Sequence, residues 1–280
     1  MVTVGVHVSI AGSIDLAVDR ARKVGCDTFQ IFSRNPRGWK FKDLTEEQIK
    51  AFREKIKESG IAVPVDHMPY LPNLASPDGV NYAQSVATLK AELARSSQLG
   101  IPYLVTHLGH HKGAGVEKGH EQVIGAVTGA FSEVKNDVML LLETTACEKN
   151  SVGGTFEDIR HIMDGIGEPE RVGVCFDTCH TFVAGYELRT PEGLGETMDQ
   201  FDEIVGIPHM KVVHLNDAKG DIGSHLDRHE HIGMGSIGEE GFRTILHNPV
   251  FTRLPLICET PVDERRDDVG NIRTVRELAA

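Results

Sequence analysis

The stretch Arg171–Leu188, RVGVCFDTCHTFVAGYEL, is the most informative part of this sequence. Its opening run, Val172–Asp177, is apolar and predicts a strand that is buried on both faces. Asp177 and His180 stand where this run gives way to a predicted loop. Because an unpaired buried charge is costly, a carboxylate and an imidazole at the end of a buried strand need polar partners. We therefore expect other parts of the chain to supply them.

Apolar runs of this kind alternate with helical patterns along the whole chain. The predicted strands are Thr3–Ser9, Thr28–Ser33, Val63–Met68, Tyr103–Gly109, Val138–Thr144, Val172–Thr178, Lys211–Asp217 and Leu254–Thr260. The predicted helices are Ile14–Val24, Thr45–Ser59, Tyr82–Leu99, Glu117–Lys135, Phe156–Gly165, Pro191–Val205, Glu239–His247 and Asp267–Leu278. Eight strand–helix repeats predict an α/β fold of the closed (β/α)8 TIM barrel type, with residues 1–280 as a single domain. The alternative is a doubly wound open sheet, but no GxGxxG motif follows the first strand.

Two predicted loops are long, Tyr70–Val80 after the third strand and Ala218–Gly238 after the seventh. In a barrel both lie on the carboxyl-terminal face, where long loops commonly serve a functional site. Thr45 and Gln48 form a predicted capping box at the start of the second helix.

The composition excludes several classes of protein. No apolar run approaches the roughly 20 residues of a membrane span, and the first residues do not resemble a signal peptide. The five cysteines form no CxxC motif, so we expect a reducing cytoplasm and no disulfide framework. The formal net charge of −12 argues against non-specific binding of polyanions.

Polar side chains gather at the ends of six consecutive predicted strands and in the loops that follow them. They are His67, His107, Glu143, Asp177, His180, His214, Asp227, His229 and Glu259. Each one alone has an ordinary explanation, such as a helix cap or a hydrogen-bonded core histidine. In a barrel, however, all of them meet at one mouth. Four carboxylates packed together repel strongly unless cations neutralise them.

These residue types indicate a catalytic metal site. Imidazoles and carboxylates without a thiolate are typical of a catalytic zinc or manganese site. A structural zinc site would instead be expected to use cysteines, as in Cys₄ sites. Nine side chains exceed the needs of one tetrahedral ion and fit two or three ions, with one carboxylate bridging. Metal ions about 3.5–4 Å apart are a known device for displacement at phosphorus. Three divalent ions would outweigh the four carboxylates and leave an electropositive mouth in an acidic protein.

The sequence resembles the endonuclease IV family of abasic-site DNA repair enzymes. The resemblance rests on two long motifs, GVCFDTCHTFVAGYEL and HLNDAKGDIGSHLDRHEHIGMGSIG, and on the strand ends HVS, DHMPYLPNLAS, THLG, LLETTA and CETP. It runs from His7 to about Pro261. It implies a TIM barrel with a trinuclear zinc site that hydrolyses the phosphodiester 5′ to an abasic site, leaving a 3′-hydroxyl and a 5′-deoxyribose phosphate. The family also trims blocked 3′ ends.

The resemblance also implies a role for each clustered residue. His67, His107 and Glu143 would hold the first zinc. Glu143 would bridge to the second zinc and position the attacking hydroxide. The other ligands of the second zinc would be Asp177, His214 and Glu259, and those of the third would be His180, Asp227 and His229. Mn²⁺ is an alternative ion at one or more positions, and no protein general acid is needed.

A second set of residues is expected to contact duplex DNA. Arg37, Tyr70 and Leu71 match positions at which the family enters the DNA. An abasic nucleotide has no pairing or stacking to lose, so apolar wedges can fill its gap cheaply. Further candidates from the predicted loops are Arg34, Trp39, Arg228, Lys219 and Lys112. Trp39 could instead cover the barrel mouth, and Tyr70 could instead pack its own loop. A monomer would suffice for this activity.

Four other histidines lie near the expected site. His110 stands where the family often has a small polar residue, so His110 or His111 could compete for metal or contact a phosphate. His231 and His7 are expected to support the site without binding metal.

Two other functions fit parts of the pattern. A metal-dependent sugar isomerase on the same barrel also gathers Glu, Asp and His at its strand ends, but it needs fewer ligands and lacks the basic, aromatic loop Arg34–Trp39. A protein that binds damaged DNA or zinc without cutting could lose a bridging ligand, yet all nine are present.

Overall fold

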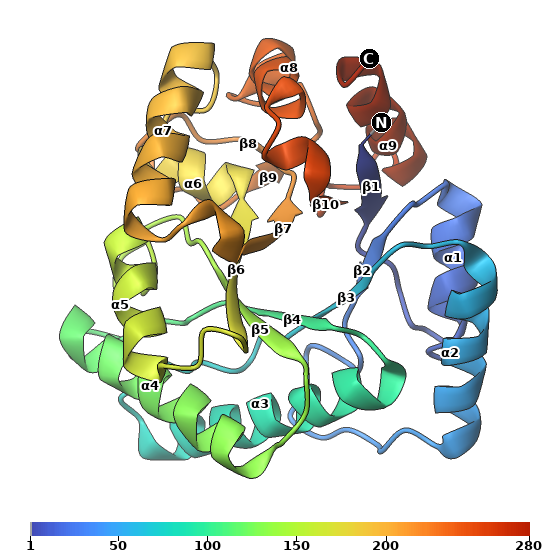
Figure 1. Ribbon diagram of the computed structural model, residues 1–280, viewed down its shortest axis with the longest axis vertical. Helices are drawn as coiled ribbons and strands as arrows, with labels where there is room; N and C mark the ends of the chain where they lie inside the picture. Colours follow the sequence, from blue (N-terminus) through green and yellow to red (C-terminus); the bar gives the residue numbers. More distant parts are fainter. Residues whose placement is uncertain (1) are drawn as a thin grey trace.

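Eight short strands form one parallel sheet in residues 2–280, the part of the chain that the computed structural model describes. They are β1 (Thr3–Val6), β2 (Phe29–Ile31), β3 (Pro64–His67), β4 (Tyr103–Thr106), β5 (Met139–Glu143), β6 (Val172–Asp177), β7 (Met210–His214) and β10 (Pro255–Cys258). Their order in the sheet is β1-β10-β7-β6-β5-β4-β3-β2. The sheet curls round until β1 and β2 lie next to each other, with the helices outside (Figure 1). The predicted TIM barrel is therefore confirmed.

The surrounding helices alternate with the strands of the barrel, except that two helices follow β6. They are α1 (Leu16–Val24), α2 (Glu46–Ser59), α3 (Gly79–Leu99), α4 (Val116–Glu133), α5 (Phe156–Ile166), α6 (Thr178–Ala184), α7 (Pro191–Ile204), α8 (Gly238–His247) and α9 (Asp268–Leu278). Two 3₁₀ turns, η1 (Ile207–His209) and η2 (Phe251–Arg253), precede β7 and β10. The C-terminal helix α9 packs beside β1, so the two ends of the chain meet (Figure 1). No helix among residues 2–280 is long and apolar enough to cross a membrane.

The seam between β1 and β2 closes the barrel. Here the two strands are joined by a parallel bridge between His7 and Gln30, in which the Val8 amide donates to the Gln30 carbonyl at 2.8 Å. A second backbone bond runs from the Asp27 amide to the Val4 carbonyl at 2.8 Å. The seam is thus shorter than the ladder between β1 and β10, where four residue pairs are in register.

The barrel interior is a layer of small apolar side chains. Fully buried residues from six strands pack together there, namely Val65, Val105, Leu141, Cys175, Val212 and Ile257. Side chains two residues apart on a strand point to the same face. The next inward-facing residues are therefore His67, His107, Glu143, Asp177, His214 and Glu259. An apolar floor thus lies directly beneath six of the expected ligands.

The chain departs from the predicted elements after β6 and after β7. His180 was predicted in a loop but lies on the short helix α6, which Asp177 caps by accepting from the His180 amide at 2.8 Å. The predicted loop Ala218–Gly238 overlaps a two-stranded hairpin of β8 (Asp217–Ala218) and β9 (His229–Glu230). The helix and the hairpin are both short, so the sequence shows no periodic pattern for them. Their tertiary contacts stabilise them. The predicted capping box of Thr45 and Gln48 is present at the start of α2.

Candidate metal centre

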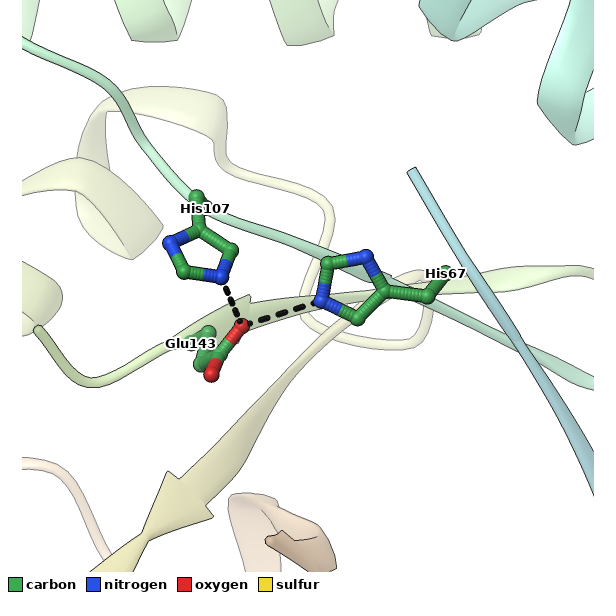
Figure 2. Close-up of side chains that lie close together, drawn as sticks. All are labelled: His67, His107 and Glu143. Atoms are coloured by element: carbon green, nitrogen blue, oxygen red, sulfur yellow. Dashed lines mark hydrogen bonds and ion pairs between the residues drawn. The ribbon is translucent and has the colours of Figure 1, made fainter. Parts of the chain in front are cut away.

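Three residues from neighbouring strands form the first candidate ligand group. The Nε2 atoms of His67 and His107 lie 3.2 and 3.1 Å from the same carboxylate oxygen, Oε2 of Glu143 (Figure 2). The other ring nitrogen of His67, Nδ1, donates to the Met68 carbonyl at 2.6 Å. In the neutral imidazole this bond places the proton on Nδ1 and leaves Nε2 free to bind a metal.

The second group collects around the other oxygen of Glu143. His214 Nδ1 lies 3.0 Å from Glu143 Oε1, 3.3 Å from Glu259 Oε2 and 3.8 Å from Asp177 Oδ2. The four ligand atoms lie within 4.8 Å of one another. The two oxygens of Glu143 therefore face two different ligand groups, as a bridging carboxylate requires.

The third group lies beyond Asp177. His180 Nε2 is 3.1 Å from Asp227 Oδ1 and 3.4 Å from His229 Nε2. The outer nitrogens of both imidazoles contact backbone carbonyls, since His180 Nδ1 bonds to Thr144 O at 2.9 Å and His229 Nδ1 to Glu259 O at 3.1 Å. Asp177 Oδ2 is 3.7 Å from His229 Nε2, so this carboxylate borders both the second and the third groups.

These spacings fit metal ligation. Two atoms that bind one zinc at about 2.1 Å and at the tetrahedral angle are separated by about 3.4 Å. The closest contacts in the three groups, from 3.0 to 3.4 Å, match that separation. All nine residues of the predicted ligand set fall into these three groups.

The charges of the site are strongly coupled. Burial would raise the pKa of Glu143, but the imidazoles of His107 and His214 outweigh burial and hold this pKa well below its ordinary value of 4.5. The pKa of Glu259 is also held well below 4.5 despite burial, chiefly by the imidazole of His214. Burial would likewise lower the pKa of His180 and His214. Asp177 and Asp227 nevertheless raise the pKa of His180 well above 6.5, and Cys175, Glu259 and Glu143 do the same for His214. Without metal, protons on these imidazoles therefore balance part of the negative charge.

A thiol also lies close to the ligands. Cys179 forms a fourth possible group with Asp177 and His229. Burial raises the pKa of this thiol, and its sulfur lies 3.8 Å from the Arg228 carbonyl. A protonated thiol is a poor ligand, so the His and carboxylate groups remain the better candidates.

Three polar residues that the sequence did not single out hold the ligands in place. Asn216 donates to Asp177 Oδ2 at 2.8 Å, and its oxygen accepts from the Glu259 amide at 2.7 Å. The Thr144 hydroxyl accepts from the Asp177 amide at 3.0 Å. Gln30 contacts His7, His214 and Glu259. A signal for Gln30 was present, because it is the one polar residue in the apolar strand FQI.

The predicted DNA contacts lie mostly on the rim of the mouth. Tyr70 is 63% exposed and Leu71 38%, and Arg37, Lys112, Lys219 and Arg228 are also exposed. The Tyr70 ring packs edge-on against Phe32 at 4.9 Å, and its amide bonds to Pro36 on the neighbouring loop. Trp39 is half-buried. A cleft of about 500 Å³ is lined by Tyr70 and Leu71 together with the ligands His67, His107, His180 and Asp227.

Arg34, which was also predicted to contact DNA, is buried and does not lie exposed on this rim. Its side chain is buried, and its Nε lies 2.9 Å from Glu92 Oε1, which is equally buried. A second nitrogen donates to the Thr88 hydroxyl at 3.1 Å. Arg34 therefore anchors its loop to α3 and does not face solvent.

The spare histidines have structural contacts. His110 lies 3.6 Å from Glu148, and His111 Nδ1 accepts from the Gly113 and Gly115 amides. His231 is fully buried and bonds to Asp263 at 3.0 Å and to Asn271 at 3.1 Å.

Comparisons with known proteins agree with this architecture. A family model described as xylose isomerase-like TIM barrel matches residues 18–279. The chain is 64% identical to a protein of Methanoculleus marisnigri named "Probable endonuclease 4", covering 100% of this chain and 99% of the relative. It is 51% identical to a protein of the same name from Nitrosopumilus maritimus, with 99% of each chain covered.

The solved structures separate the family from its wider class. The crystal structure of endonuclease IV from Thermus thermophilus matches with a TM-score of 0.87 and 34% identity, covering 99% of this chain and 98% of that one. A D-tagatose 3-epimerase-like protein matches with a TM-score of 0.73 at 18% identity, a likeness that extends to the fold alone. Within the class of xylose isomerase-like TIM barrels, this chain belongs to the endonuclease IV family.

Replacing Arg34 tests its structural role. Arg34→Ala leaves the Glu92 carboxylate buried without its partner, so the free energy of unfolding should fall by about 3 kcal/mol. Urea denaturation of the zinc-loaded protein measures this change. Arg37→Ala, on the same loop but exposed, is the control and should change stability by less than about 0.5 kcal/mol. Equal stability of the two variants would contradict the burial of Arg34.

The coupled charges predict how the stability of the metal-free protein depends on pH. The raised pKa of His180 and His214 contributes stability that is complete below 6.5 and is lost as pH rises through the folded values. The lowered pKa of Glu143 and Glu259 contributes stability that is lost as pH falls below 4.5. Urea denaturation after chelation should therefore give a maximum between these two pH values. A free energy of unfolding that keeps rising above pH 6.5 would contradict this account.

Proposed function

We propose that this protein is a DNA repair endonuclease that hydrolyses the phosphodiester 5′ to an abasic site and leaves a 3′-hydroxyl and a 5′-deoxyribose phosphate. Its cofactors are three zinc ions, with manganese as an alternative in one or more positions. Its substrates are double-stranded DNA with abasic sites and DNA with blocked 3′ ends. We further propose that it acts as a monomer, as a single domain over residues 1–280, in the reducing cytoplasm.

The observation that carries the proposal is the position of Glu143. Its two oxygens face two candidate ligand groups, and Asp177 of the second group also lies next to His229 of the third. This arrangement supports a cluster of ions rather than separate sites. Membership of the endonuclease IV family supports phosphodiester hydrolysis in DNA as the chemistry of that cluster.

The ligand groups divide the chemical work. Zinc ions in such a cluster supply a nucleophile at neutral pH and stabilise the charge of the leaving oxygen. Glu143, at the junction of the first two groups, would position the nucleophile for in-line attack. His180, Asp227 and His229 would hold the zinc ion whose positive charge stabilises the leaving 3′-oxygen. Because a metal ion would stabilise the leaving oxygen without a proton transfer, we assign no general acid to the protein.

The rim supports recognition of the lesion. Arg37, Tyr70 and Leu71 stand beside the cleft that leads to the ligands. We propose that Tyr70 and Leu71 fill the gap in the base stack while the abasic nucleotide enters this cleft, because that nucleotide has no pairing to lose. Arg37, Arg228, Lys219 and Trp39 would contact the strands on either side.

Cleavage of a duplex with one abasic analogue that cannot undergo β-elimination tests this function. The protein is assayed as purified, after prolonged chelation, and after zinc is restored. We expect incision 5′ to the analogue with a 3′-hydroxyl end, its loss on chelation and its return with zinc. A protein fully loaded with zinc that leaves this duplex intact would exclude the proposal and favour a sugar as the substrate.

Glu143→Gln tests the bridging carboxylate. A neutral amide cannot supply two anionic oxygens to two ions. The rate of incision should therefore fall by more than about 100-fold, which exceeds the effect typical of residues that only support metal ligands. Glu148→Gln is the matched control, because Glu148 lines the cleft outside the ligand groups. Circular dichroism checks that the fold survives. Full incision with unchanged zinc content would refute the bridging role.

A further inference from the structure

Gln30 is a buried amide at the seam of the barrel. It lies on β2, is fully buried, and forms the backbone bridge to His7 that joins β2 to β1. Its side chain points into the barrel, where it contacts two of the expected ligands, His214 and Glu259. A buried amide on an apolar strand is costly unless its hydrogen bonds are made, so its partners explain why it can stand there.

The partners decide which way the amide faces. A Glu259 carboxylate can only accept, so the atom 2.7 Å from its Oε1 must be the Gln30 nitrogen. The Gln30 oxygen then lies 2.8 Å from His214 Nε2 and accepts a hydrogen bond from this nitrogen. The second amide hydrogen points toward His7 Nδ1 at 3.1 Å. Every polar atom of the side chain is thereby used.

This orientation selects one form of His214. An imidazole that donates from Nε2 to Gln30 carries no proton on Nδ1 in its neutral form. Nδ1 is the nitrogen that faces Glu143, Asp177 and Glu259. At Glu259 the same amide occupies Oε1 and leaves Oε2, 3.3 Å from His214 Nδ1, turned toward the ligand group. A single side chain thus aims two ligands of the second group.

Three of the other four imidazoles in the candidate ligand groups are oriented differently. His67, His180 and His229 each use a backbone carbonyl as the outer partner. A backbone carbonyl is present whatever the side chain is, whereas the partner of His214 depends on the residue at position 30. The second group is therefore the part of the site that one outer substitution can loosen.

We propose that Gln30 is a positioning residue that orients His214 and Glu259 for metal binding. The inference rests on the ligand set of the proposed function and extends it to a residue outside that set. Outer partners of metal ligands typically contribute 10- to 100-fold to metal affinity. The Gln30 amide nitrogen also contacts His7 across the seam, so the same side chain links the β1–β2 seam to the second ligand group.

Three single variants of the full-length, zinc-loaded protein test the proposal. Gln30→Met keeps the length of the side chain and removes its hydrogen bonds. Gln30→Glu keeps an acceptor for His214 but has no donor for Glu259. Thr28→Val is the matched control, because Thr28 is buried two residues earlier and its hydroxyl bonds to the Val63 carbonyl, away from the ligands.

The readout is zinc loss to an excess of a coloured chelator at constant pH, with zinc content and melting temperature measured alongside. Gln30→Met should lose zinc about 10- to 100-fold faster than the wild type. Thr28→Val should keep the wild-type rate, and Gln30→Glu should fall between Met and the wild type. A role in packing alone predicts the reverse order, because a buried carboxylate is harder to accommodate than a neutral thioether.

Two results would overturn the proposal: wild-type zinc retention in Gln30→Met, or faster zinc loss from Gln30→Glu than from Gln30→Met. If Gln30→Met does not fold, Gln30→Glu decides. Zinc loss that is faster than that of Thr28→Val but less than about 100-fold faster than that of the wild type then supports the proposal. A rate equal to that of Thr28→Val, or a loss more than about 100-fold faster than that of the wild type, overturns it. The assay contains no DNA. A wild-type protein that holds zinc but does not incise abasic duplexes would therefore refute the proposed function without touching this inference.

Discussion

The rest of the structure depends on a carboxylate, Glu143, that is fully buried among imidazoles. A buried charge of this kind is tolerated only when opposite charge surrounds it. His67 and His107 lie on one side of Glu143 and His214 on the other, and each comes from a different strand. The geometry of the barrel mouth is therefore tied to the electrostatic needs of one side chain at the end of β5.

The period of two along each strand links the core to the site. Val65, Leu141 and their equivalents fill the barrel interior, and the residue two positions later on each strand points the same way. An apolar layer beneath the ligands excludes water from below and keeps the polar layer at the mouth. Stability of the fold and positioning of the ligands thus come from the same strands, in successive layers.

Two strands contribute to this polar layer without supplying a ligand to any group. β1 leads to His7 and β2 carries Gln30, and the two residues meet across the seam. Their side chains reach the second ligand group, so the short seam of the barrel is braced by the site as well as by its backbone bonds. The family resemblance pointed to the nine candidate ligands, whereas the contacts of Gln30 became visible only in the folded chain.

Much of this protein was predictable from local pattern. Alternation of strand and helix predicted the barrel. Polar residues at strand ends predicted where the candidate ligands would gather, because parallel strands place their carboxyl ends on one face. The capping box at Thr45 depends on residues three apart and was equally predictable. These features were predictable because they arise from interactions along a few residues or from a repeat.

Long-range contacts decided the remainder. Arg34 reads as an exposed loop arginine, yet Glu92 on α3 draws it into the interior. His180 reads as a loop residue, yet the cap that Asp177 supplies begins a helix there. The sequence by itself determined the barrel and the set of residues at its mouth. Only the tertiary structure decided which oxygen of Glu143 faces which group and which nitrogen of His214 faces Gln30, because those choices depend on partners more than 70 residues away along the chain.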